Sequence, residues 1–153
     1  MFFRRLAMAL LLTLFSGGIA HADLELYLNS LDFSAHGNFG GYRAELGAHF
    51  GASAPQLDLL FRTVDRPGDA AICLWLSRQS RQPLETVLNQ YGSRKGGGWG
   101  ALAQSLGIKP GSPAFKALKA GEIGWHPAST ARPGGEKQHG DRPGYAQARK
   151  KQG

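Results

Sequence analysis

The sequence D-A-A-I-C-L-W-L-S-R-Q-S-R, residues 69–81, decides the fold of this chain. Residues 70–76 are apolar at every position, and neither proline nor glycine interrupts them. A helix that is apolar nearly all round is buried among other elements. We therefore predict a central, buried helix over 69–81. Its Cys73 is the only cysteine of the chain, so an intramolecular disulfide is impossible and we expect a small buried hydrophobic side chain.

Amphipathic segments lie on both sides of this helix in the sequence. Leu57, Phe61 and Val64 follow one another at helical spacing, and Ser53 stands where a helix N-cap is expected. A turn is expected over 38–41. The same spacing of apolar residues predicts further short helices over 42–50, 84–91, 99–106 and 113–118. The fold class is therefore mainly α, a small single-domain bundle of about five to six short helices.

The segment before these helices fits two kinds of secondary structure. Leu24, Leu26 and Leu28 alternate with polar or aromatic residues, as in a short N-terminal strand. Leu24, Tyr27, Leu28 and Leu31 are spaced equally well for one face of a helix. The alternation slightly favours the strand.

The N-terminal segment, residues 1–22, is typical of a secretory signal peptide. Arg4 and Arg5 supply a positive charge near its start, the apolar run over 6–15 that follows is too short to span a bilayer, and the segment ends in the sequence A-H-A at 20–22. Cleavage after Ala22 leaves a mature chain that begins at Asp23. We predict a periplasmic or secreted protein with no integral membrane span after signal removal.

Positive charge is concentrated near the C-terminus. The formal net charge is +7, and removal of the two N-terminal arginines lowers it to +5. Residues 23–122 carry ten Lys and Arg against nine Asp and Glu, whereas residues 123–153 carry six against two and few aliphatic side chains. A stretch that buries so little apolar area does not offset the entropy of ordering. We predict a helical domain over 23–121 and a disordered basic Gly/Pro-rich tail over 122–153, with Trp125 exposed to solvent.

Three stretches of the expected domain resemble a small uncharacterised family of exported bacterial helical proteins. They are P-G-D-A-A at 67–71, G-W-G-A-L-A at 98–103 and L-G-I-K-P-G-S at 106–112. The resemblance covers roughly residues 24–121. It implies an exported, mainly helical domain, and it implies no activity, because the function of that family is unknown.

The strongest local candidate for a binding site is the basic, glycine-rich sequence S-R-K-G-G-G-W at 93–99. Backbone N–H groups at the positive end of a helix, together with two cations, form an anion-binding arrangement. The spacing is not that of a phosphate-binding loop, and a solvated helix connector is the alternative interpretation. The candidate anion-binding residues are Arg94, Lys95, Gly96, Gly97, Gly98 and Trp99.

The chain end offers a second candidate site. Arg149, Lys150 and Lys151 form a short cationic cluster, and Trp125 and Tyr145 are the only large anchors of the tail. Cations neutralise phosphates while aromatic rings stack on bases or sugars. This pattern predicts binding of nucleic acid, anionic lipid or polysaccharide. A terminus that only improves solubility is the alternative.

Motifs for catalysis and metal binding are missing from the sequence, and one stretch resembles a DNA-binding motif. The histidines share no ligand spacing, and no nucleophile elbow or zinc-protease motif occurs, so no metal or cofactor is expected. Asp65 and Asp69 are placed to cap a helix rather than to transfer protons. Residues 101–118 resemble a helix-turn-helix, but their second helix is short, and an exported protein rarely meets an operator. We therefore expect no specific DNA recognition, and a plain helical hairpin explains the same residues.

These observations favour a non-enzymatic binding or interaction module of the cell envelope, whose partner is an envelope protein. The alternative is a polyanion binder that uses the glycine-rich segment and the tail.

Overall fold

The computed structural model describes residues 19–128 and, among these, every side chain except those of 19–22, 94 and 95. The described part contains seven α-helices and one 3₁₀-helix, and no strand. In chain order they are α2 (Ile19–Gly37), α3 (Phe39–Phe50), α4 (Ala54–Thr63), α5 (Pro67–Ser80), α6 (Leu84–Arg94), η1 (Lys95–Gly97), α7 (Gly98–Ser105) and α8 (Pro113–Ala120). The expectation of a small helical bundle is confirmed.

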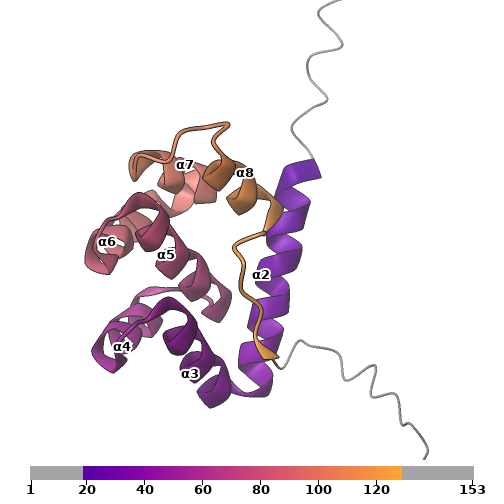
Figure 1. The fold of residues 1–153 in the computed structure, drawn as a ribbon, viewed down its shortest axis with the longest axis vertical. Coiled ribbons are helices and arrows are strands. Elements are labelled where there is room, and N and C mark those ends of the chain that lie inside the picture. Colours follow the sequence, from indigo (N-terminus) through magenta and orange to yellow (C-terminus); the bar gives the residue numbers. More distant parts are fainter. Residues whose placement is uncertain (1–18, 129–153) are drawn as a thin grey trace, which may run out of the picture.

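Helix α2 forms one side of the bundle, and the other helices pack beside it (Figure 1). It contacts α3, α5 and α8, while α5 also packs on α6, and α6 on α7. None of the helices in the described part of the chain is both long enough and apolar enough to cross a membrane.

Helix α5 is the buried centre of the bundle, as its sequence predicts. Every side chain from Ala70 to Leu76 is buried, Cys73 and Trp75 included. The N-terminus of α5 is capped from a distant part of the chain, because the Asp32 carboxylate on α2 accepts a hydrogen bond of 2.6 Å from the backbone N–H of Gly68. A Cβ atom at Gly68 would lie 2.9 Å from the carbonyl oxygen of Leu28, so glycine permits this close approach of α5 to α2.

The N-terminal segment is a helix, and the preference for a strand is wrong. Leu24, Leu28 and Leu31 are buried against the other helices, whereas Leu26 is 68% exposed. A strand would place Leu24, Leu26 and Leu28 on one face. The helical alternative buries more apolar surface, because Tyr27 and Leu31 then face the core as well.

The turn expected over 38–41 is shorter than predicted. Asn38 is the N-cap of α3, and its side-chain oxygen accepts a hydrogen bond of 2.9 Å from the backbone N–H of Gly41. This cap satisfies a backbone donor at the helix start, so Phe39 and Gly40 already belong to the helix. The predicted end at Phe50, followed by Gly51 in the left-handed conformation, is confirmed.

The folded domain extends beyond the predicted boundary at Gly121. We call residues 121–128 the strap; it runs beside α2 (Figure 1). Ile123, Trp125 and Pro127 are buried and alternate with exposed residues, so one side of the strap faces the core.

Trp125 holds the middle of the strap in an aromatic cluster. Its ring centroid lies 5.4 Å from that of Tyr42 and 6.1 Å from that of Phe50, and its carbonyl oxygen accepts a hydrogen bond from the Tyr27 hydroxyl. The prediction that Trp125 is exposed is therefore wrong, because partners distant in sequence enclose it. The expected tail from residue 129 onward lies outside the described residues.

Candidate functional site

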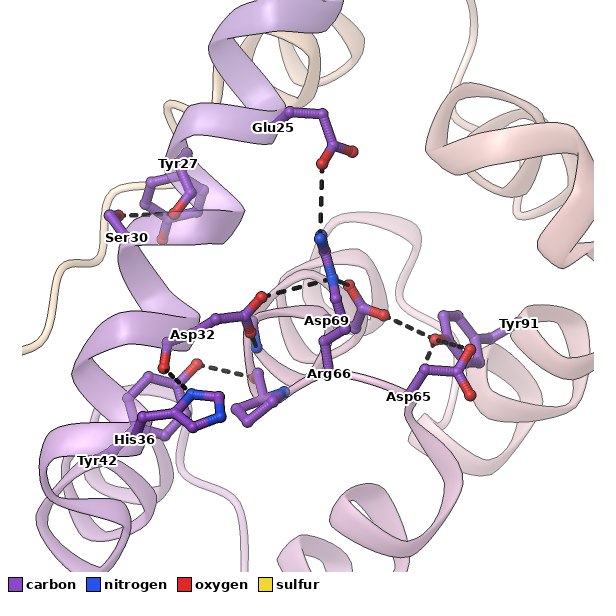
Figure 2. A network of polar contacts seen from close by, with 12 residues as sticks. Glu25, Tyr27, Ser30, Asp32, His36, Tyr42, Asp65, Arg66, Asp69 and Tyr91 are labelled. Atoms are coloured by element: carbon purple, nitrogen blue, oxygen red, sulfur yellow. Dashed lines mark hydrogen bonds and ion pairs between the residues drawn. The ribbon is translucent and has the colours of Figure 1, made fainter.

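Arg66 is the centre of a charged cluster at the N-terminal end of α5. It is the N-cap residue of α5, and its guanidinium lies 3.6 Å from the Glu25 carboxylate and 3.5 Å from those of Asp32 and Asp69 (Figure 2). Glu25 and Asp32 come from α2, whereas Asp69 lies in the first turn of α5. The cluster thus joins the two helices whose close packing is described above.

Tyr91 on α6 extends the cluster toward Asp65. Its hydroxyl donates a hydrogen bond of 2.7 Å to the Asp69 carboxylate and lies 3.3 Å from a carboxylate oxygen of Asp65. It also accepts a hydrogen bond of 3.2 Å from the backbone N–H of Asp65. A phenol has one proton to donate, so the shorter contact assigns this proton to Asp69. Tyr91 therefore fixes the ends of α5 and α6 relative to each other.

Burial and charge change the acidity of three groups in the cluster. Burial raises the pKa of Asp69, while hydrogen bonding to Tyr91 and the charge of Arg66 act in the opposite direction. Burial also raises the pKa of Tyr91, so its hydroxyl stays protonated at neutral pH. For Arg66, burial lowers the pKa, but the attraction of Asp69, Asp32 and Glu25 outweighs this effect and the pKa is raised.

A pocket of about 250 Å³ opens beside this cluster. The rings of Tyr91 and Trp99 form one wall, with centroids 5.6 Å apart and an angle of 34° between their planes. The polar part of the lining comes from Asp65, Arg66 and Asp69. Gly98 and Leu102 complete the pocket.

The charges around the pocket are unbalanced. The described lining of the pocket holds two carboxylates, those of Asp65 and Asp69, against the guanidinium of Arg66, so its formal charge is −1. Glu25 and Asp32, which pair with Arg66 from α2, add two further negative charges nearby. A pocket with these charges attracts cations and repels anions.

The predicted anion-binding residues are only partly brought to this pocket. Arg94 ends α6, Gly96 and Gly97 belong to η1, and Gly98 and Trp99 begin α7. The segment is therefore a helical connection rather than an open loop. Gly98 and Trp99 line the pocket, beside carboxylates. The side chains of Arg94 and Lys95 lie outside the described part, so their anion binding stays a prediction.

The second predicted site, Arg149, Lys150 and Lys151, also lies outside the described residues. Among the side chains that the structure describes, no group of three or more His, Cys, Asp or Glu is arranged to hold a metal ion.

Sequence reasoning identified two members of the cluster and assigned them a different role. Asp69 does lie in the first turn of α5, but its carboxylate contacts Tyr91 and Arg66, and Asp32 supplies the cap. The sequence D-R-P-G-D at 65–69 was the available signal, because it places two acids around an arginine at a helix start. Glu25, Asp32 and Tyr91 carry no such local signal.

No protein-family model, curated protein or solved structure matches this chain, so the chemistry of the pocket is derived from its own residues.

Proposed function

We propose that this protein is an exported, non-enzymatic binding module of the cell envelope, and that the pocket between α5, α6 and α7 takes a cationic group of its ligand. The observation that carries the proposal is the excess of carboxylates around a pocket walled by Tyr91 and Trp99. The N-terminal sequence supports export, since it has the features of a secretory signal.

The existing contacts of Arg66 favour a cationic ligand. Its guanidinium already faces three carboxylates, so it is a poor partner for an incoming anion. An ammonium or guanidinium group in the pocket meets the carboxylate of Asp65 and the half-buried ring of Trp99. A cation over an aromatic ring contributes about 0.5–2 kcal/mol, depending on its desolvation. An acid and an aromatic wall together are therefore suited to such a group.

The lining of the pocket supports binding rather than covalent catalysis. Among the residues whose side chains the structure describes, none that lines it is a serine, cysteine, lysine or histidine. The Tyr91 hydroxyl is a weak nucleophile here, because burial raises its pKa and its proton is held by Asp69.

The test is a titration of the purified protein with argininamide, which carries a guanidinium and no carboxylate, followed by tryptophan fluorescence. We expect saturable binding and a signal that disappears in Trp99→Phe. Asp65→Asn should weaken binding by about three- to tenfold, since a hydrogen bond to a charged group is lost from a partly exposed site. The matched control is Asp58→Asn, because Asp58 pairs with Arg43 on the surface and does not line the pocket.

Two results would contradict the proposal. One is the absence of saturable argininamide binding by the wild-type protein. The other is equal affinity of Asp65→Asn and Asp58→Asn, which would place any binding elsewhere.

The charge of the C-terminal segment supports a second candidate function, the binding of a polyanion. Residues 123–153 carry six Lys and Arg against two Asp and Glu. Retention on heparin should then fall steeply with salt, and replacement of Arg149, Lys150 and Lys151 by serine should shift elution to lower salt. Elution that does not change with these substitutions would exclude the chain end as the binding site.

A further inference from the structure

A second pocket, of about 360 Å³, is also lined by Trp99. Its walls come from α2, α7 and α8, and they are mostly apolar, with Leu24, Ala101, Phe115 and Leu118 as the main contributors. The polar residues of the lining are Glu25, Gln104 and Lys119. One carboxylate and one ammonium balance each other, so this pocket is apolar and neutral where the first is aromatic and acidic.

The two pockets adjoin each other. Both are lined by Gly98 and Trp99, so they share one wall. Glu25 connects them too, because it lines the second pocket while its carboxylate pairs with Arg66 of the first. A ligand that fills both has to cross the wall at Gly98 or at Trp99.

The shared wall has no side chain at Gly98. Nothing lies within 4 Å of the position that a Cβ atom of Gly98 would take, and Gly98 is exposed, as are Gly96 and Gly97 before it. Exposed glycine backbone permits the close approach of another main chain.

We infer that the two pockets together bind a polypeptide segment in which a Lys or Arg neighbours a large apolar side chain. The basic side chain occupies the pocket of Asp65 and Tyr91, the apolar side chain occupies the pocket of Phe115 and Leu118, and the main chain crosses the glycines between them. Charge complementarity selects the basic group, since the carboxylates of Asp65 and Asp69 outnumber the guanidinium of Arg66 in the described lining of the first pocket. This inference rests on the proposed function and adds the class of ligand.

Short peptides with blocked ends test the inference on the purified full chain. One series contains Arg followed by Leu, either directly or after one glycine, and the reference peptides replace either Leu or Arg by glycine. We expect the best Arg–Leu peptide to bind about tenfold more tightly than the Arg-only peptide, because burial of a leucine side chain lowers the dissociation constant by at least this factor. The Leu-only peptide should bind most weakly.

A substitution at Gly100 distinguishes the contributions of the two pockets to binding. A Cβ atom at this position would lie 3.5 Å from Cζ of Phe115, in ordinary contact, so Gly100→Leu extends into the second pocket. We expect this variant to lose the advantage of leucine while its affinity for argininamide stays unchanged. Gly92→Leu is the control, because Gly92 is exposed on α6 with nothing within 4 Å of its Cβ position. If far-UV circular dichroism shows that Gly100→Leu is unfolded, Gly100→Ala replaces it, with an expected two- to threefold loss.

The outcomes distinguish this inference from the function on which it rests. Equal affinity of the Arg–Leu and Arg-only peptides at both spacings, or an undiminished leucine advantage in the Gly100 variants, overturns the two-pocket inference alone. A Leu-only peptide that binds as tightly as the Arg–Leu peptide also overturns it. If argininamide does not bind the wild-type protein, the proposed function is wrong as well.

Discussion

Replacement of Trp125 by alanine should destabilise the domain strongly. The side chain is 6% exposed and packs against the rings of Tyr42, Phe50 and His49. Truncation of a buried tryptophan to alanine costs about 3–5 kcal/mol. The hydrogen bond from Tyr27 ends on the backbone carbonyl of residue 125, so it survives the substitution and does not add to the loss. We therefore expect a decrease of about 3–5 kcal/mol in the free energy of unfolding.

Urea denaturation followed by far-UV circular dichroism measures this decrease, and thermal unfolding should show a midpoint lower by about 10–20 °C. Glu122→Ala is the matched control in the strap, because Glu122 is exposed and should change stability by less than about 0.5 kcal/mol. Two truncations then locate the boundary of the domain. A chain that stops after Gly121 should be destabilised at least as much as Trp125→Ala, whereas a chain that stops after Ala128 should not.

A loss of less than about 1 kcal/mol for Trp125→Ala would refute this reasoning, because a loss that small is typical of a surface substitution. Equal stability of the two truncated chains would show that residues 122–128 do not belong to the folded domain.

Three further predictions concern α5 and its surroundings. Gly68→Ala should destabilise by about 1–3 kcal/mol in urea denaturation, because its Cβ would press on the carbonyl of Leu28, whereas Gly92→Ala on an exposed helix face should be neutral or stabilising. Burial raises the pKa of Asp69, so the folded state holds the carboxyl proton of Asp69 more tightly than the unfolded state does. The stability that this proton contributes is therefore fully present below the unfolded pKa of about 3.8, and it is lost as the pH rises through the folded pKa. The free energy of unfolding of the wild type relative to Asp69→Asn should therefore fall as the pH rises above about 3.8, and a rise would contradict the shift. Cys73 should resist a thiol reagent in the native protein and react after denaturation, because burial raises the pKa of its thiol.

Helices with local signals could be predicted from the sequence. The spacing of apolar residues and the caps were sufficient for α4, where Ser53 and Gln56 form a capping box. They were sufficient for α8 as well, where the Ser112 hydroxyl accepts a hydrogen bond from the backbone N–H of Phe115. Both signals lie within a few residues of the element they define, which is why one sequence reveals them.

The errors concern segments whose structure depends on distant residues. The order of the strap comes from Trp125 packing among residues of α3 and from the hydrogen bond to Tyr27, 98 positions away. Composition alone predicted disorder there, because the number of apolar residues in a segment does not show which distant residues they pack against. The N-terminal segment was ambiguous for the same reason, since only the surrounding helices determine whether Leu26 or Leu31 is buried.

The candidate site was even less accessible to sequence reasoning. Its acids and its tyrosine come from α2, α5, α6 and the connection before α5, and the hydrogen bonds that assemble it span 22 to 36 positions. Each residue alone has an ordinary interpretation as a surface acid or a core aromatic. Only their arrangement around Arg66 creates the excess of negative charge.

This excess has a consequence for stability that follows from the proposed function. Three carboxylates pair with the guanidinium of Arg66, and that of Asp65 lines the same pocket, so these groups repel one another. The raised pKa of Asp69 reflects burial in this setting, to which the nearby charge of Asp32 adds. A bound cation offsets the repulsion in the folded state alone, because the cluster does not exist in the unfolded chain. At a concentration 100 times its dissociation constant, argininamide should thus stabilise the domain by about 2.7 kcal/mol, which corresponds to a rise of about 10 °C in the unfolding midpoint. Sodium chloride at the same ionic strength should not reproduce this rise, and an equal shift with both would reduce the effect to general screening of the surface charges.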